Sequence, residues 1–328
     1  MVRGLVIKST GSSYIVRMED GSDAECHIKG NFRIRGIRST NPVAVGDYVT
    51  VNLTTEGDPT AQAVLQQSGP AGETGPIGWI TDVEPRCNYI IRRATNLSKE
   101  SHIIAANIDQ VALIVTVNHP VTSTTFIDRF LATAEAYRVP AMIIFNKIDL
   151  LSPDELLRLD ELRVLYESIG YKTLAISAKK LSNESGLLDE LRGRVTLLSG
   201  NSGVGKSTLL NALFGKEIAR TGQISDAHNK GMHTTTFSEM YELVENRGWI
   251  IDTPGIKGFG AVDMQKEEVG HYFREIFRIG QQCRFGNCTH TNEPGCAVQQ
   301  AAIEGQIALS RMESYLSLLG DCTESKYR

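Results

Sequence analysis

The sequence lacks any apolar run long enough to cross a membrane. Its longest such run, Val111–Val115, has five residues, whereas a membrane-spanning helix needs about 20. No apolar segment follows the first Met, because Lys8, Arg17 and Glu19 interrupt that region. We therefore expect neither a secretion signal nor a membrane anchor, and we expect a cytoplasmic protein.

An excess of charge of either sign is also missing. The chain has 34 Lys and Arg residues against 38 Asp and Glu residues, which gives a net charge of −4. A protein with so little net charge has no long-range positive field, so any contact with nucleic acid must come from local basic patches. The length of 328 residues predicts two or three domains.

Helical periodicity is absent from residues 1–97, which we expect to form the first domain. About five short β-like runs occur there instead, separated by turns. These runs are Leu5–Lys8, Tyr14–Met18, Tyr48–Val51, Gly78–Val83 and Tyr89–Arg93. The pattern predicts a small β-barrel, either OB-like or SH3-like.

Two basic groups stand out in this predicted barrel. The first surrounds Phe32 and the second lies near the end of the domain. Their members are Lys29, Arg33, Arg35 and Arg38 in the first group and Arg86, Arg92 and Arg93 in the second. Basic side chains with an aromatic suit the RNA backbone and base stacking, which favours RNA binding. An ordinary solvated face is the alternative.

Residues 200–207 match the phosphate-binding loop G-x-x-x-x-G-K-[ST]. The preceding residues predict a buried strand, and Ser207–Leu213 predicts a helix that ends at Gly215. In this context Lys206 reaches the β- and γ-phosphates, which makes it one of our expected catalytic residues, and the Ser207 hydroxyl holds Mg²⁺. The residues expected to contact nucleotide here are Gly200, Asn201, Ser202, Gly203, Val204, Gly205, Lys206, Ser207 and Thr208.

Two earlier motifs point to guanine as the base. Asn146–Asp149 reads N-K-x-D after a buried strand, and the Asp149 carboxylate can accept from the guanine N1–H and N2 amino groups, a pair that adenine lacks. Asn146 can bond the acceptor side of the base and tie this loop to the phosphate loop, while the Lys147 stem covers the base. The tetrapeptide alone would fit an N-cap and turn equally well.

The next predicted strand ends in Ser177, Ala178 and Lys179. This S-A-K triplet matches the second base-binding loop of GTPases, in which a backbone N–H meets the guanine O6. The triplet is a weak signal alone, but its position directly downstream of N-K-x-D makes it a strong one.

Downstream of the phosphate loop, Asp252–Gly255 reads D-x-x-G. Asp252 would act on Mg²⁺ through water, and the Gly255 N–H would contact the γ-phosphate. In the preceding polar stretch, Thr235, or else Thr234, would close on Mg²⁺ and the γ-phosphate as in switch I. The base loops thus come before the phosphate loop, so residues 98–262 predict an α/β P-loop GTPase domain in circularly permuted order.

Ile256 follows the D-x-x-G motif, where Ras-like enzymes place a Gln that orients the attacking water. An isoleucine cannot do this, so slow intrinsic hydrolysis is expected. His233 is our candidate for the catalytic group, and a solvent-exposed loop histidine without a role is the alternative.

Residues 263–328 predict a helical zinc-binding domain with a closed ligand set. Cys283, Cys288, His290 and Cys296 follow the pattern C-x4-C-x-H-x5-C. Three thiolates and one imidazole leave no open coordination position, so we expect one structural Zn²⁺. Free thiols are the alternative. Gly320 is expected to end the last helix.

The motifs, taken in this order, resemble the RsgA family of circularly permuted GTPases, also called YjeQ. The resemblance covers nearly the whole chain. It implies an OB-fold N-terminal domain, GTP and GDP with Mg²⁺ as ligands, and GTP hydrolysis stimulated by the 30S ribosomal subunit and its 16S rRNA. It also implies a role late in maturation of that subunit. The family lacks the switch II Gln, in agreement with Ile256. A monomer is expected.

Three other functions remain open from the sequence. The protein could be a GTPase that acts on another RNA or ribonucleoprotein, such as a tRNA or the large subunit. It could be a nucleotide-gated binding module without catalysis, although intact Lys206, Ser207 and Asp252 argue against that. It could also be an ATPase, which Asp149 argues against.

Overall fold

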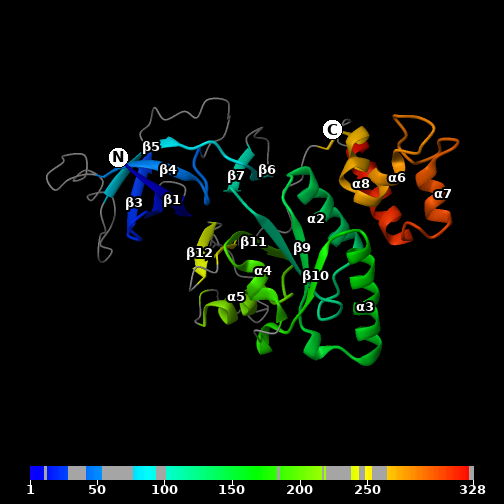
Figure 1. The fold of residues 1–328 in the computed structure, drawn as a ribbon, viewed down its shortest axis with the longest axis horizontal. Helices are drawn as coiled ribbons and strands as arrows, with labels where there is room; N and C mark the ends of the chain where they lie inside the picture. Colours follow the sequence, from blue (N-terminus) through cyan, green and yellow to red (C-terminus); the bar gives the residue numbers. More distant parts are fainter. Residues whose placement is uncertain are drawn as a thin grey trace, which may run out of the picture.

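In a computed structural model the chain forms three regions, and the N-terminal barrel and the C-terminal helices flank a central domain (Figure 1). None of the described helices is both long and apolar enough to cross a membrane. The structure describes residues 1–10, 13–28, 42–53, 77–93, 101–182, 185–215, 218, 238–243, 248–252 and 264–324.

The first region is a closed five-stranded barrel. Its strands are β1 (Val2–Ser9), β2 (Tyr14–Met18), β3 (Asp23–Ile28), β4 (Tyr48–Leu53) and β5 (Ile77–Val83). They neighbour one another in the order β1-β2-β3-β5-β4, and β4 returns to β1. Alternate side chains such as Val6, Val16, Val49 and Ile80 fill the interior because successive residues of a strand face opposite sides. The predicted OB-like barrel is confirmed.

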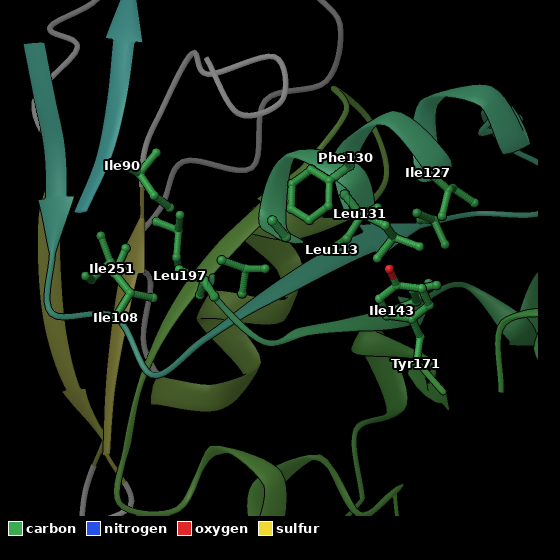
Figure 2. Packing of buried hydrophobic residues seen from close by; sticks show 14 of the residues in the cluster. Ile90, Ile108, Leu113, Ile127, Phe130, Leu131, Ile143, Tyr171, Leu197 and Ile251 are labelled. Carbon is green, nitrogen blue, oxygen red and sulfur yellow. The ribbon is translucent and has the colours of Figure 1, made fainter. Parts of the chain in front are cut away.

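One predicted barrel strand lies elsewhere. β6 (Tyr89–Arg93) pairs with β7 (Ser101–Ala106) in a separate two-stranded sheet, and Ile90 packs near Ile251 and Leu197 of the central domain (Figure 2). The fifth barrel strand is β3 instead. Its sequence pattern is weak because only small or half-buried apolar residues alternate with polar ones. The predicted boundary after residue 97 falls between β6 and β7, outside the described residues, and stays a prediction.

The central domain is built on a mostly parallel sheet. Its strands are β8 (Gln110–Val115), β9 (Ala141–Phe145), β10 (Lys172–Ala175), β11 (Arg194–Gly200), β12 (Glu239–Leu243) and β13 (Gly248–Asp252). They run in the order β10-β9-β8-β11-β13-β12, and only β12 is antiparallel to its neighbour β13. The chain order reverses between β8 and β11, which is where open α/β sheets bind ligands.

Helices cover both faces of this sheet. They are α2 (Thr124–Ala136), α3 (Pro153–Ser168), α4 (Leu187–Leu191) and α5 (Lys206–Phe214). On one face Ile127, Phe130 and Leu131 of α2 pack with Leu113 and Ile143 of the strands (Figure 2). Side chains of α4 and α5 pack in a second cluster with the opposite face of the same strands. The predicted α/β P-loop architecture is confirmed.

The C-terminal region is helical, as expected. A 3₁₀-helix spans Lys266–Tyr272, followed by α6 (Arg274–Gly280), α7 (Ala297–Ile303) and α8 (Leu309–Glu324). The expected stop of the last helix at Gly320 is wrong, because α8 continues to Glu324. Ala132 of α2 lies in the same apolar cluster as Phe273 and Tyr315, so the region packs directly against the central domain.

A buried ion-pair network joins the C-terminal region to the central domain. The Arg311 guanidinium of α8 donates to both oxygens of Glu275 at 2.6 and 3.0 Å and to Asp128 Oδ1 of α2 at 2.8 Å. Tyr166 of α3 donates to the same Asp128 oxygen at 2.9 Å. Burial lowers the pKa of Arg311, but the hydrogen bonds and charges of Glu275 and Asp128 raise it by more, so the guanidinium stays charged.

The barrel joins the opposite side of the central sheet through β12. Lys8 of β1 pairs with Glu239 of β12 in an antiparallel bridge, so the two sheets are continuous. Arg17 donates to Glu242 of β12 at 2.6 Å and lies over the Trp249 ring of β13. Both interdomain junctions thus combine backbone or apolar contacts with arginine ion pairs.

We expect Arg311→Met to lower the free energy of unfolding by about 3–5 kcal/mol, because it leaves two buried carboxylates without their partner. Arg129→Met is the matched control, since Arg129 pairs with Asp321 at the same junction but is 37% exposed, and it should cost about 1 kcal/mol or less. Chemical denaturation measures both, and equal losses would contradict a dominant role for Arg311.

Candidate nucleotide-binding site and metal centre

The predicted nucleotide residues gather at one edge of the central sheet. Because β8, β9, β10, β11 and β13 are parallel, their carboxyl ends lie side by side. Asn146 directly follows β9, and Ser177 lies two residues past the end of β10. Gly200 ends β11 and Asp252 ends β13. Motifs more than 100 positions apart in the chain therefore share one site.

The phosphate-binding loop connects β11 to the first turn of α5. Its glycines have backbone conformations that other residues rarely adopt, with φ of 83° at Gly203 and 97° at Gly205. A Cβ on Gly205 would lie 2.3 Å from Asn146 Nδ2, so only glycine allows this approach. α5 begins at Lys206, and the loop therefore presents the N–H groups of a helix N-terminus, which suit a phosphate.

Asn146 connects three loops of the site. Its Nδ2 donates to the Val204 carbonyl at 2.8 Å, and its Oδ1 accepts from the Ala178 N–H at 2.9 Å. The residue is 2% exposed. The link to the phosphate loop agrees with the sequence expectation. Since both ends of the amide are used within the protein, Asn146 fixes the spacing between the base loops and the phosphate loop.

Lys147 lies against the phosphate loop from the same N-K-x-D segment. Its Nζ donates to the Gly203 carbonyl at 2.7 Å and to the His119 carbonyl at 2.6 Å. The sequence motifs give no signal for the loop that carries His119, because its contribution is a backbone carbonyl that any residue has.

Asp149 stays ionised in this environment. The neighbouring Ser177 hydroxyl and the positive charges of Lys180 and Lys179 hold the pKa of its carboxyl below the usual range. Ser177 precedes the 3₁₀-turn Ala178–Lys180. An ionised, solvent-accessible carboxylate is the acceptor that the guanine N1–H and N2 amino groups require.

Lys206 and Asp252 meet at the other end of the loop. Lys206 Nζ donates to Asp252 Oδ1 at 2.8 Å, and both side chains are largely buried. A lysine expected on the phosphates and a carboxylate that would hold Mg²⁺ therefore occupy adjacent positions.

Four predicted ligands in the C-terminal region converge on one point. The ligand atoms of Cys283, Cys288, His290 and Cys296 all lie within 4.8 Å of one another. Cys283 Sγ is 3.6 Å from His290 Nδ1 and 3.9 Å from Cys296 Sγ, and His290 Nδ1 is 3.4 Å from Cys296 Sγ. Tetrahedral zinc bonds of about 2.3 Å to sulfur and 2.0–2.1 Å to nitrogen give edges of about 3.5–3.8 Å. The set is therefore compatible with zinc.

Glu293 stabilises the loop that carries these ligands through hydrogen bonds within the loop. Its carboxylate accepts from the Thr289 N–H at 2.7 Å, the Thr289 hydroxyl at 2.6 Å and the Thr291 N–H at 2.9 Å. Burial alone would raise the pKa of Glu293, but these hydrogen bonds lower it to about 2. The loop thus has internal support beyond the metal ligands.

Several predicted residues lie outside the described part of the chain. These are His233, Thr234, Thr235, Gly255 and Ile256, together with the basic group Lys29, Arg33, Arg35 and Arg38. Arg86 of the second basic group is described and is not available to RNA. It donates to both Asp47 oxygens at 2.6 Å and to the Pro42 carbonyl, and its side chain is 6% exposed.

We expect Cys288→Ser to abolish zinc binding, because a structural site that loses one of four ligands loses much of a binding free energy of about 10–16 kcal/mol. Native mass spectrometry should find one zinc ion per wild-type chain and none in this variant. Cys87→Ser, which removes an exposed thiol outside the cluster, should retain one ion. Full zinc content in Cys288→Ser would disprove the proposed ligand set.

Comparison with known families agrees with this geometry. The family model "RsgA GTPase" matches residues 83–262, and the model "RsgA N-terminal domain" matches residues 3–60. Proteins named "Small ribosomal subunit biogenesis GTPase RsgA" from Phocaeicola vulgatus and Bacteroides fragilis are 56% and 58% identical to the chain over 327 residues. In both cases 100% of this chain and 99% of the relative are covered.

Solved structures show the same fold. YjeQ from Thermotoga maritima is 32% identical, with a TM-score of 0.71 and coverage of 98% of both chains. YloQ, described as a circularly permuted GTPase, is 27% identical, with a TM-score of 0.72 and coverage of 100% of this chain and 97% of its own. The permuted motif order, the shared fold and the full-length identity lead to one conclusion: this chain belongs to the RsgA GTPase family and is a GTP hydrolase.

Proposed function

We propose that this GTPase binds the small (30S) ribosomal subunit, hydrolyses GTP in response and acts late in maturation of that subunit. The observation that carries the proposal is full-length identity of 56–58% to two proteins named for small-subunit biogenesis. A likeness over the whole chain includes the barrel and the C-terminal region as well as the GTPase domain.

The hydrolysis site would use residues from both sides of the phosphate loop. Lys206 would contact the β- and γ-phosphates, and Ser207, Thr235 and Asp252 would hold Mg²⁺, with Asp252 acting through water. The Gly255 N–H would contact the γ-phosphate. Mg²⁺ would neutralise the charge that develops on the phosphate oxygens. The Lys206–Asp252 contact supports this arrangement, because the Lys206 ammonium and the Asp252 carboxylate lie next to one another.

The base would lie between the two base loops. Asp149 would accept from guanine, the Lys147 stem would cover the ring, and the Ala178 N–H or a neighbouring one would face the guanine O6. Because Asn146 already occupies the Ala178 N–H, the adjacent Lys179 N–H is the better candidate for that contact. The nucleotide ligands of this site would be GTP and GDP.

The partner would be contacted from both flanks of the central domain. The barrel and the C-terminal helices lie on either side of it (Figure 1), so a large ribonucleoprotein could meet both at once. We propose 16S rRNA as the contacted component, a single structural Zn²⁺ in the C-terminal region, a monomeric chain and a cytoplasmic location, where ribosomal subunits mature. A GTPase that acts on a tRNA or the large subunit is the alternative.

The GTPase rate with and without purified subunits tests the proposal. We expect 30S subunits to raise kcat at saturating GTP and 50S subunits to leave it unchanged. Stimulation by 50S but not by 30S would replace this function with the alternative, and hydrolysis that responds to neither would reject stimulation altogether.

We expect His233→Ala to retain GTP binding. Its 30S-stimulated kcat should fall by about 10²–10⁴-fold, because a general acid or base accelerates a reaction by a factor of that order. Ile256 cannot orient the attacking water as the glutamine of Ras-like enzymes does, so another group is needed for that step. Stimulated turnover should be measured beside nucleotide affinity in the same preparation. An unchanged stimulated kcat would remove His233 from the mechanism.

Asp149→Asn should reduce the preference for GTP over ATP by about tenfold or more, because an amide cannot accept from both guanine donors as a carboxylate does. Competition between the two nucleotides for a fluorescent GDP analogue measures this ratio. Asp160→Asn is the control, since it removes an exposed carboxylate on α3 outside the site. If the ratio stays at the wild-type value, Asp149 does not read the base.

A further inference from the structure

We propose that Asn118 and Glu155 are positioning residues for guanine-nucleotide binding. They act by fixing the His119 carbonyl, which accepts a hydrogen bond from the Lys147 ammonium group. Neither residue belongs to a nucleotide motif. The proposal rests on the nucleotide-contacting role proposed above for Lys147, and the experiment below separates the two.

Lys147 has two fixed acceptors, one on each of two loops. One is the Gly203 carbonyl of the phosphate loop, and the other is the His119 carbonyl of the loop between β8 and α2. Lys147 itself has φ of 64°, a backbone conformation that costs free energy for a residue other than glycine. A lysine stem that is held at both its backbone and its ammonium group is pre-organised to cover a base.

The loop with His119 packs against the phosphate loop and is internally tied. A Cβ on Gly203 would lie 3.5 Å from Pro120 Cδ, which puts Pro120 in contact range of the phosphate loop. Thr116 Oγ1 donates to the Pro120 carbonyl at 2.5 Å, and the Thr122 hydroxyl accepts from the Thr116 N–H at 3.1 Å. These bonds fix the base of the loop, and none of them is made by His119 itself, whose position needs a further constraint.

Asn118 supplies that constraint. Its Oδ1 accepts from the His119 N–H at 2.9 Å, and its Nδ2 donates to Glu155 Oε1 in the first turn of α3. The other Glu155 oxygen accepts from the Ser152 N–H at 2.8 Å, which completes the capping box of α3. Glu155 therefore anchors the loop tip to a helix end, and it stays ionised because the Ser152 N–H and the Asn118 amide lower its pKa.

The chain of contacts runs from Glu155 through Asn118 to the His119 N–H, and from the His119 carbonyl through Lys147 to Gly203. Its loss would free the His119 carbonyl and leave the ammonium with one fixed acceptor. GDP and GTP should be affected alike, because Lys147 contacts the loop at Gly203, whereas the groups expected near the γ-phosphate are Lys206 and Asp252.

Asn118→Asp tests the hydrogen bond between Asn118 and Glu155, called here the Asn118–Glu155 bridge, since it places a second carboxylate opposite that of Glu155. We expect the Kd of Mg²⁺-GDP and of Mg²⁺-GTPγS to rise by about tenfold each. The double variant Asn118→Asp with Glu155→Gln restores a donor opposite an acceptor. An aspartate at 118 still accepts from the His119 N–H, and a glutamine at 155 still accepts from the Ser152 N–H. Affinity should therefore return to within about threefold of wild type.

Asp154→Asn is the matched control, because it removes one carboxylate from the same turn of α3 without touching the bridge, and its Kd should equal that of the wild type. Wild-type affinity in Asn118→Asp, or a loss that the double variant does not restore, would overturn the proposal. Lys147→Ala is measured in parallel. If it too binds normally, the proposed role of Lys147 fails; if it alone weakens binding, only the Asn118–Glu155 bridge fails.

Discussion

The nucleotide site depends on one side chain amide. Asn146 donates to the phosphate loop and accepts from the second base loop, and it is almost completely buried. A buried amide with both ends satisfied has one favourable geometry, because displacement would leave a polar group unpaired at a cost of about 1–3 kcal/mol. The loop that carries Asn146 therefore fixes the spacing between the predicted second base loop and the predicted phosphate loop.

Strand pairing in the central sheet explains why permuted chain order is compatible with GTPase chemistry. Catalysis needs the carboxyl ends of five parallel strands to lie together, and strand pairing provides this whatever the order of connection. The permuted order changes which parts of the chain follow the predicted switch I and switch II segments. β12 follows the predicted switch I and pairs with barrel strand β1, while the C-terminal region follows switch II. The buried Arg311 network ties that region to α2 and, through Tyr166, to α3, so it is anchored to the half of the domain that carries the predicted base loops.

The sequence predicts motif-based features best. The phosphate loop, the base loops and the zinc ligands are short patterns whose chemistry fixes their spacing. The four residues of the zinc pattern lie together and Asn146 contacts the phosphate loop, while the nucleotide roles stay predictions. Features that depend on tertiary context are not predictable in this way. β3 has too weak an alternation to identify, β6 has a barrel-like pattern but packs in the central core, and Arg86 resembles an RNA ligand but is neutralised by Asp47. The contact of the His119 carbonyl with Lys147 cannot be predicted from side-chain patterns, because every residue has a backbone carbonyl.

A crystal structure of the chain with Mg²⁺-GDP tests the central claim most directly. The account predicts the diphosphate within the loop 200–207 with Lys206 Nζ on a phosphate oxygen, the guanine N1 and N2 groups on Asp149, and the Asn146 bridge between Val204 and Ala178 unchanged from its present geometry. A base that points away from Asp149, or a bridge that breaks to admit the nucleotide, would contradict a site that Asn146 pre-assembles.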